Sequence, residues 1–158
     1  MTHLIRTYTQ TDVDGIKACL VELQDFEKLM DPHRLEGIQV AHTYLEHLLK
    51  LCETGHGTIF VVEIDGAIVG MISVYIEDDT KHFRKAKRYA YISDLIVMKE
   101  YQDKGITKEL LEKAEVYAQS KDVTTIQASI LRGHEEGLSG YLRNGFHEFE
   151  VRVRKKIS

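Results

Sequence analysis

The feature that most constrains the fold is an apolar run, a short polar loop and an amphipathic pattern, followed by a second apolar run. The run Leu95-Ile96-Val97-Met98 predicts a buried strand over residues 88–98, and the spacing after it predicts a helix over 106–120. Residues 123–131 again have the composition of a strand. A crossover of this kind is right-handed and joins parallel neighbours. We therefore expect strands 88–98 and 123–131 to lie side by side and parallel.

A second local signal is a β-hairpin. Residues 58–64 and 67–76 are rich in β-branched side chains, and Asp65-Gly66 between them can supply the two positive φ angles of a tight turn. The remaining patterns predict strands at 3–8 and 146–157 and helices at 11–30 (capped by Thr11), 39–53 and 135–144. We expect an α/β (α+β) fold, with a mixed sheet and helices on both faces. No linker or repeat divides the chain, which predicts one domain over 1–158.

Composition excludes several classes of function. The 21 basic and 25 acidic residues give a net charge of −4, whereas dedicated nucleic-acid-binding domains are usually basic. The longest uncharged apolar stretch, 67–76, is too short to cross a membrane, and no apolar leader follows Met1, so we expect a cytoplasmic location. Cys19 and Cys52 lie far apart, and no HExxH motif occurs, so no metal is expected.

The loop before the helix at 106–120 is a candidate anion site. Gly105 lets the backbone turn tightly, and the first N–H groups of a helix have no partner within it. The helix dipole adds positive charge there, so such an end binds phosphate. The loop lacks the GxxxxGK[ST] and GxGxxG patterns. Taken alone, the segment fits an ordinary strand–helix connection better than an anion site, because such loops are common in α/β units.

The ordered set of motifs resembles the GNAT superfamily of N-acetyltransferases. Gln102-Asp-Lys-Gly-Ile-Thr107 is similar to the family's acyl-CoA pyrophosphate loop, and Tyr141-Leu-Arg-Asn-Gly-Phe146 is similar to its Y-x-x-x-G-F motif. Ile5 to Asp12 and the turn at Asp65-Gly66 resemble its first strand and its hairpin. Each motif is short, but together they cover nearly the whole chain in the family's order.

The resemblance implies that acetyl-CoA, as co-substrate, lies where two parallel strands splay apart. Backbone groups of the first strand would face the pantetheine and the acetyl carbonyl, and loop N–H groups would cradle the pyrophosphate. His134 stands where the family often has an asparagine that supports the pantetheine. The implied cofactor-binding residues are Leu95, Ile96, Val97, Gln102, Asp103, Lys104, Gly105, Ile106, Thr107 and His134.

Two residues match catalytic positions of the family. Tyr141 matches the tyrosine that protonates the leaving CoA thiolate, and Asp94 occupies a position where a carboxylate can accept the amine's proton through water. From the residues alone, Tyr141 could equally be a core aromatic, and Asp94 could pair with a cation at the end of a strand.

Phe26-Glu27 resembles the aromatic–Glu pair of polyamine-type acetyltransferases and is the candidate acceptor site. It predicts a primary amine of a small cationic, polyamine-like molecule as acceptor; a solvated helix face and a protein or peptide amine are the alternatives. Family members are often dimers, so a homodimer is possible, and neither nucleic acid nor membrane is an expected partner. The basic run 81–88 is interpreted as a solvated loop, with RNA or an acidic protein as the alternative partner.

Three positions depart from the family pattern. Thr107 stands where glycine or alanine is usual, and His134 and Gly137 stand in a region where the family often has asparagine and alanine. These departures leave open a non-catalytic acyl-CoA sensor or an interaction module of the same fold.

Overall fold

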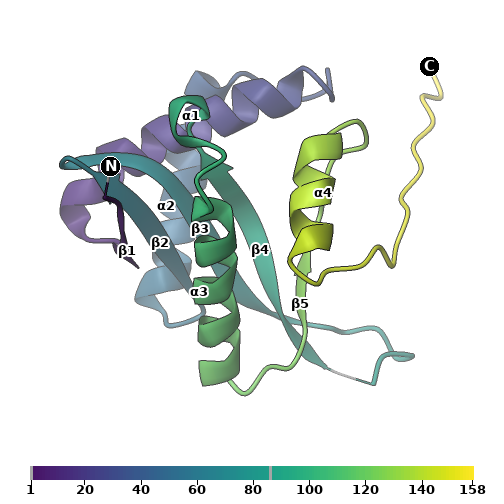
Figure 1. Ribbon diagram of the computed structural model, residues 1–158. Helices are drawn as coiled ribbons and strands as arrows, with labels where there is room; N and C mark the ends of the chain where they lie inside the picture. The colour runs from purple at the N-terminus through teal and green to yellow at the C-terminus, as the bar shows by residue number, and fades with distance from the viewer. Residues whose placement is uncertain (1, 86) are drawn as a thin grey trace.

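The computed structural model describes residues 2–85 and 87–158 and has one five-stranded sheet (Figure 1). The strands lie in chain order: β1 (Leu4–Thr7), β2 (Gly57–Ile64), β3 (Ala67–Asp78), β4 (Arg88–Val97) and β5 (Ile126–Ala128). Pairing is antiparallel from β1 to β4 and parallel between β4 and β5. The mixed sheet and its parallel pair confirm the predicted fold class.

Helices cover both faces of the sheet. On one face lie α1 (Val13–Lys28), which follows the 3₁₀ turn Gln10–Asp12, and α2 (Gly37–Glu53); α3 (Ile106–Ser120) lies on the other, and α4 (Glu135–Arg143) follows β5 (Figure 1). Neighbouring strand residues point to opposite faces, so each face has its own core. Val61 packs with the α1–α2 side and Val62 with the α3 side, and both are fully buried.

The predicted hairpin turn is confirmed. Asp65 and Gly66 have φ values of 50° and 80°, both in the left-handed region that this turn requires. A β-carbon at Gly66 would contact nothing within 4 Å, so backbone conformation and not space favours glycine there.

Three sequence predictions were wrong in detail. The strand expected at 123–131 is limited to β5, Ile126–Ala128, because only these residues pair with β4. Residues 146–157 form no strand, since no neighbouring strand pairs with them among the described residues. Thr9, not Thr11, precedes the first helical turn, and its N–H donates to Asp12 at 2.7 Å.

A partly buried ion pair fixes β1 to the start of the first helical segment. Arg6 donates to both carboxylate oxygens of Asp12, at 2.7 and 3.0 Å, and also to Glu63 on β2 at 2.6 Å. Asp12 is 6% exposed, and its hydrogen bonds from Arg6 are the main cause that lowers its pKa from 3.8 to about 2. Arg6 therefore links β1, β2 and the first turn through one guanidinium group.

Replacement of Asp12 by Asn is expected to lower the free energy of unfolding by about 2 kcal/mol at neutral pH. This figure is the free energy that corresponds to the lowering of the Asp12 pKa from 3.8 to about 2 on folding. The pKa is lowered in the folded chain, so the carboxylate's contribution is complete above about pH 4 and disappears as the pH falls toward 2. Urea unfolding of both proteins across this range measures the difference. Asp14→Asn, at an exposed position of α1, is the control; an equal cost at every pH would contradict the assignment.

Candidate active site

The two parallel strands part beyond a β-bulge. β4 and β5 pair only at Ala90–Ile126, Tyr91–Gln127 and Ile92–Ala128. The register between β3 and β4 shifts at the next residue, Ser93, and β4 then continues to Val97 paired with β3. A bulge bends its strand and increases the local twist. Residues 93–97, which include Leu95 and Ile96, therefore have a backbone edge that no described strand covers on the β5 side.

The loop that follows β4 presents a row of N–H groups. Within the described residues, no hydrogen bond to a protein acceptor forms from the N–H groups of 103–107. Asp103 and Gly105 both have positive φ, 63° and 77°, and Gly105 is the N-cap of α3. A β-carbon at Gly105 would contact nothing within 4 Å, so the glycine serves the backbone turn. Free N–H groups at a helix N-terminus can hold a phosphate.

Side chains of the loop differ in their contacts. The Gln102 side chain donates to the Val97 carbonyl at 2.8 Å and so ties the loop to the end of β4. Ile106 is 2% exposed and belongs to the core, which leaves its N–H as the group available to a ligand. Lys104 is exposed, with its ammonium 5.7 Å from the centre of the Tyr101 ring. Thr107 is partly buried in the first turn of α3.

Asp94 is the centre of a buried hydrogen-bond network. Its Oδ2 accepts hydrogen bonds from the hydroxyls of Tyr44, Ser73 and Ser93, at 2.6, 2.6 and 2.8 Å. Burial raises the pKa of Asp94, and the three hydroxyl donors offset part of that effect. The network joins α2, β3 and the bulge of β4, so it fixes the carboxylate where the parallel strands part.

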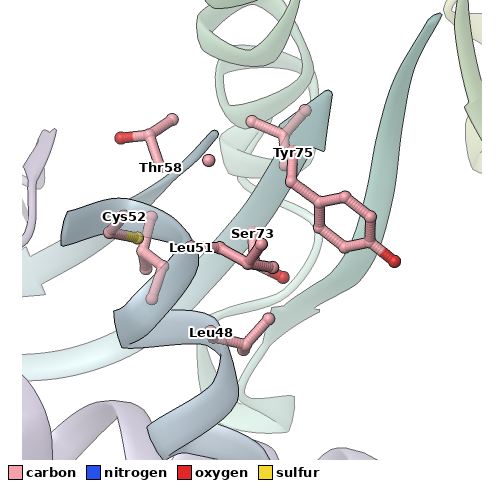
Figure 2. A pocket seen from close by; sticks show the side chains of 9 residues that line it. Leu48, Leu51, Cys52, Thr58, Ser73 and Tyr75 are labelled. Carbon is pink, nitrogen blue, oxygen red and sulfur yellow. The ribbon is translucent and has the colours of Figure 1, made fainter. Parts of the chain in front are cut away.

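Packing around Ser73 closes the network on one side. Figure 2 shows Ser73 and Tyr75 on β3 opposite Leu48 and Leu51 of α2. The crevice between these residues is too narrow to admit a water molecule. Ser73, which donates to Asp94, therefore lies in a closely packed contact between β3 and α2.

Tyr141 lies near two carboxylates. The tyrosine is on α4, and its ring packs edge-to-face on Phe146 with the ring centres 5.0 Å apart. Burial raises the pKa of Tyr141, and the charges of Asp94 and Glu27 raise it further. The carboxylates of Asp94, on β4, and Glu27, on α1, are thus close enough to Tyr141, on α4, for their charges to raise its pKa. The phenol is therefore protonated at neutral pH.

The end of α1 borders the same region. Glu27 is partly buried and forms an ion pair with Arg34 at 2.8 Å. Burial raises the pKa of Glu27, Arg34 lowers it, and Asp94 raises it. Phe26 is 44% exposed and packs edge-to-face on His134, with the ring centres 5.0 Å apart. The structure thus brings Phe26 of the predicted acceptor pair against the start of α4, and Glu27 against Arg34.

His134 and Gly137 form a matched pair. His134 is the N-cap of α4, and its Nδ1 accepts the N–H of Gly137 at 3.2 Å. A β-carbon at Gly137 would lie 2.5 Å from the His134 ring, so an alanine there would displace the imidazole. Burial lowers the pKa of His134, which favours the neutral ring that this cap requires. The residues at positions 134 and 137, both of which differ from the family pattern, therefore depend on each other.

No local sequence pattern predicted the groups that hold Asp94. Tyr44 is part of an apolar helix pattern, and Ser73 stands alone in an uncharged strand. A lone serine inside a buried strand is a weak signal of a buried hydrogen bond, but its partner depends on the bulge at Ser93. The ion pair between Arg34 and Glu27 has no local signal either, because it needs the turn between α1 and α2.

Three further structural observations concern the basic run 81–88, metal ligands and membrane-spanning helices. In the basic run 81–88, Arg84 pairs with Asp79 at 3.6 Å and Arg88 with Asp78 at 3.9 Å, consistent with a solvated loop; Ala86 lies outside the described residues. No group of three or more potential metal ligands occurs in residues 2–85 and 87–158. In the same part of the chain, no helix is both long and apolar enough to cross a membrane.

Comparison with known proteins identifies the family. A model of the acetyltransferase (GNAT) family matches residues 23–146. The chain therefore belongs to the GNAT acetyltransferase family. It is an N-acetyltransferase that takes the acetyl group from acetyl-CoA and transfers it to an amine. Among curated proteins, no sequence matches this chain.

Solved structures share the fold at low sequence identity. The aminoglycoside acetyltransferase AAC(6')-Iy, bound to a bisubstrate analogue of CoA, has a TM-score of 0.76 and 14% identity, with 100% of this chain and 99% of that chain covered. A predicted acetyltransferase from Clostridium acetobutylicum with acetyl-CoA has a TM-score of 0.78 and 13% identity, with 99% of this chain and 97% of that chain covered. AAC(6')-Ih from Acinetobacter baumannii has a TM-score of 0.73 and 17% identity, with 99% of both chains covered.

Proposed function

We propose that this enzyme acetylates the primary amine of a small polycationic molecule, and that Tyr141 and Asp94 carry the proton transfers. The observation that carries the proposal is the grouping of Glu27, Asp94 and Tyr141 around one region beside the parting of β4 and β5. Two carboxylates there attract a cationic amine. Polyamines have this chemistry, and so do aminoglycosides, which the structural neighbours AAC(6')-Iy and AAC(6')-Ih acetylate.

Acetyl-CoA fits the loop at 103–107 and the uncovered edge of β4 at 93–97. Its pyrophosphate would accept hydrogen bonds from the N–H groups of 103–107, with Lys104 adding positive charge. The pantetheine would lie along the uncovered edge of β4 at 93–97, where backbone N–H groups polarise the acetyl carbonyl. His134, at the start of α4, would border the same ligand.

The reaction then follows by direct attack. The amine loses a proton to the Asp94 carboxylate through a water molecule, and its nitrogen bonds to the carbonyl carbon of the thioester. The C–S bond breaks, and Tyr141 donates its proton to the CoA sulfur as thiolate charge develops. The attacking nitrogen gives up its second proton as the amide forms, which restores the phenol of Tyr141, and Asp94 passes its proton to solvent. The products are an acetylated amine, free CoA and one proton. The protein contributes positioning and electrostatic stabilisation as well as the two proton transfers.

An amine panel tests the acceptor class. The purified protein and acetyl-CoA are incubated with spermidine, an aminoglycoside, free lysine or a peptide with a free N-terminus, and release of CoA thiol is followed while mass spectrometry detects the acetylated product. We expect the highest kcat/KM with the polycationic small amines. Preference for the peptide N-terminus or for lysine would contradict the proposal.

Replacement of Glu27 by Gln is expected to raise KM for the cationic acceptor by about tenfold, with a smaller change in kcat, because it removes a charge that attracts the substrate. The pKa of Glu27 is raised, so in the native enzyme KM for the acceptor also rises as the pH falls through that raised pKa. Steady-state kinetics across pH measures both effects. Glu22→Gln, at an exposed position of the same helix, is the control; equal effects of the two substitutions would contradict the role of Glu27.

A further inference from the structure

The carboxylate of Glu27, which is proposed to attract the acceptor, already has a cationic partner. Arg34, in the connection between α1 and α2, forms an ion pair with it, with Nη1 2.8 Å from Oε2. Burial raises the pKa values of Glu27 and Asp94, and the charge of Arg34 lowers both. One guanidinium group therefore acts on both carboxylates. A cationic acceptor that approaches Glu27 meets a group of its own sign.

Arg34 is held incompletely at this position. Its Nη1 also donates to the Gln24 side-chain oxygen at 3.0 Å. Its Nε, in contrast, is buried and has no hydrogen-bond acceptor among the described residues. A buried donor of this kind has lost its hydrogen bonds to water and gained none from the protein, which is unfavourable. The guanidinium is therefore bound less firmly than one whose donors are all satisfied.

A second carboxylate lies within reach of the same guanidinium. Asp31 Oδ2 is 3.8 Å from Nε of Arg34, which is too long for a hydrogen bond. A small shift toward Asp31 would give Nε the acceptor that it lacks and would release Glu27. The other cation at Asp31 is Arg154, at 3.3 Å, and its side chain is 62% exposed. Such an exposed pair contributes little, so it leaves Asp31 able to receive Arg34.

The two positions of Arg34 differ in what they leave free. With Arg34 on Glu27 the carboxylate is neutralised, and with Arg34 on Asp31 it can receive an ammonium group. The side chains of Glu27 and Arg34 are 23% and 33% exposed, so a solute can reach the pair. We infer that Arg34 is a displaceable counter-ion: the ammonium group of the acceptor replaces it on Glu27, and the guanidinium moves to Asp31. The inference rests on the proposed function, because it needs a cationic acceptor.

This exchange makes Arg34 a specificity-determining residue. When Arg34 leaves, a partly buried carboxylate stays unpaired unless the acceptor supplies a positive charge, and an unpaired charge of this kind is unfavourable. A molecule with two or more amino groups can place one ammonium group on Glu27 while another amine, after losing its proton, reacts. A single amine cannot do both. The exchange therefore favours acceptors with several amino groups.

Kinetics of the purified protein with spermidine at pH 8, chosen to keep Glu27 ionised, test the competition. Arg34→Gln should lower KM for spermidine about fivefold, with a smaller change in kcat, because the substrate no longer competes for Glu27. In a Glu27→Gln background the same substitution should change KM by less than about twofold. Lys28→Gln is the matched control. Lys28 is a cation at the end of the same helix, but it pairs with the exposed Glu36 at 3.1 Å, so KM should stay near the native value.

Asp31→Asn tests the second position of the guanidinium. The substitution removes the charge that receives Arg34, so KM for spermidine should rise about fivefold in the native background. In the Arg34→Gln background it should have no effect, because no guanidinium is there to move. A general loss of negative charge would instead raise KM equally in both backgrounds. Melting curves followed by circular dichroism check that each variant is folded.

The native chain provides a measurement that does not depend on the folding of Arg34→Gln. ¹⁵N-labelled protein bound to CoA is titrated with spermidine, and the Nε–H signal of Arg34 is followed by NMR. The signal is assigned by its loss in Arg34→Lys. We expect it to shift as Nε gains an acceptor, and we expect a smaller shift in Asp31→Asn.

Several results would overturn the inference. One is an unchanged or raised KM in Arg34→Gln while the native enzyme acetylates spermidine, and in that case the proposed function would stand without the exchange. Others are an equal fall in KM in the native and Glu27→Gln backgrounds, equal effects of Asp31→Asn in its two backgrounds, and an Arg34 Nε–H signal that stays unchanged at saturating spermidine. A native enzyme that does not acetylate spermidine would overturn the proposed polyamine acceptor and this inference with it.

Discussion

Tyr141→Phe is expected to reduce kcat by about a hundredfold to a thousandfold, with little change in the affinity for acetyl-CoA. This substitution removes only the hydroxyl that we assign as the general acid, and general acids contribute factors of this size. The ring packing on Phe146 is retained. Kinetics of CoA release measure kcat, and calorimetric titration measures acetyl-CoA binding.

The environment of Tyr141 makes the hydroxyl a proton donor over a wide range. Burial and the charges of Asp94 and Glu27 raise the pKa of Tyr141, so the phenol keeps its proton well above neutral pH. A cationic acceptor placed among these carboxylates would offset their charge and so make the phenol a better acid when substrate is bound. The activity should therefore show no loss due to Tyr141 deprotonation below about pH 10.

A matched tyrosine is available as a control for this experiment. Tyr117, on α3, has a buried hydroxyl that forms no hydrogen bond within the described residues. Tyr117→Phe therefore removes a hydroxyl from the same core without breaking a hydrogen bond and without touching the assigned general acid. We expect kcat not to change. If Tyr141→Phe keeps the native kcat, another group protonates the thiolate.

Asp94→Ala is expected to lower the free energy of unfolding by about 3 kcal/mol, because one buried and two partly buried hydroxyls lose their common acceptor. For a chain of this length such a loss lowers the melting temperature by about 6–12 °C. The donors that lose their acceptor lie on α2, β3 and the bulge of β4, so the region where β4 and β5 part should also lose order. Thermal unfolding followed by circular dichroism measures the shift.

Two further variants separate the structural role of Asp94 from a role as the base. Tyr44→Phe removes one of the three hydrogen bonds and should cost about 1 kcal/mol, with activity largely kept. Asp94→Asn keeps the size of the side chain and one oxygen acceptor, so it should keep more stability than Asp94→Ala and still lose activity. Native activity in Asp94→Asn would leave Asp94 with a structural role only.

The direction of the Asp94 pKa also predicts the pH profile. A base acts in its deprotonated form, and burial raises the pKa of Asp94. With a saturating acceptor, kcat should therefore fall at a higher pH than an ordinary aspartate would require as the solution is acidified. A profile that stays flat down to about pH 4 would contradict this role.

Elements with local signals were predictable from the sequence. The limits of α3 and the turn at Asp65-Gly66 follow from side-chain spacing and from residues that accept positive φ. Gly105 marks the candidate anion-binding loop for the same reason. The positions of Asp94 and Tyr141 in the chain came from the family resemblance, whereas their shared environment needed the tertiary structure.

Features that depend on distant partners were not predictable. The short β5 and the unpaired C-terminal segment have strand-like sequences, but a strand exists only where a neighbour supplies hydrogen bonds. The network at Asp94 requires the extra residue Ser93 in β4 and the passage of α2 over β3, and neither leaves a local pattern.

The central claim is that the N–H groups of 103–107 and the uncovered edge of β4 hold acetyl-CoA. The most direct test is a titration of ¹⁵N-labelled protein with acetyl-CoA, with the backbone amide signals followed by NMR and ATP as a control ligand that has phosphates but no pantetheine. We predict that acetyl-CoA shifts the amide signals of 103–107 and of 93–97 together, and that ATP does not shift those of 93–97. Signals that stay unchanged in both segments at saturating acetyl-CoA, or that shift only elsewhere in the chain, would contradict the account.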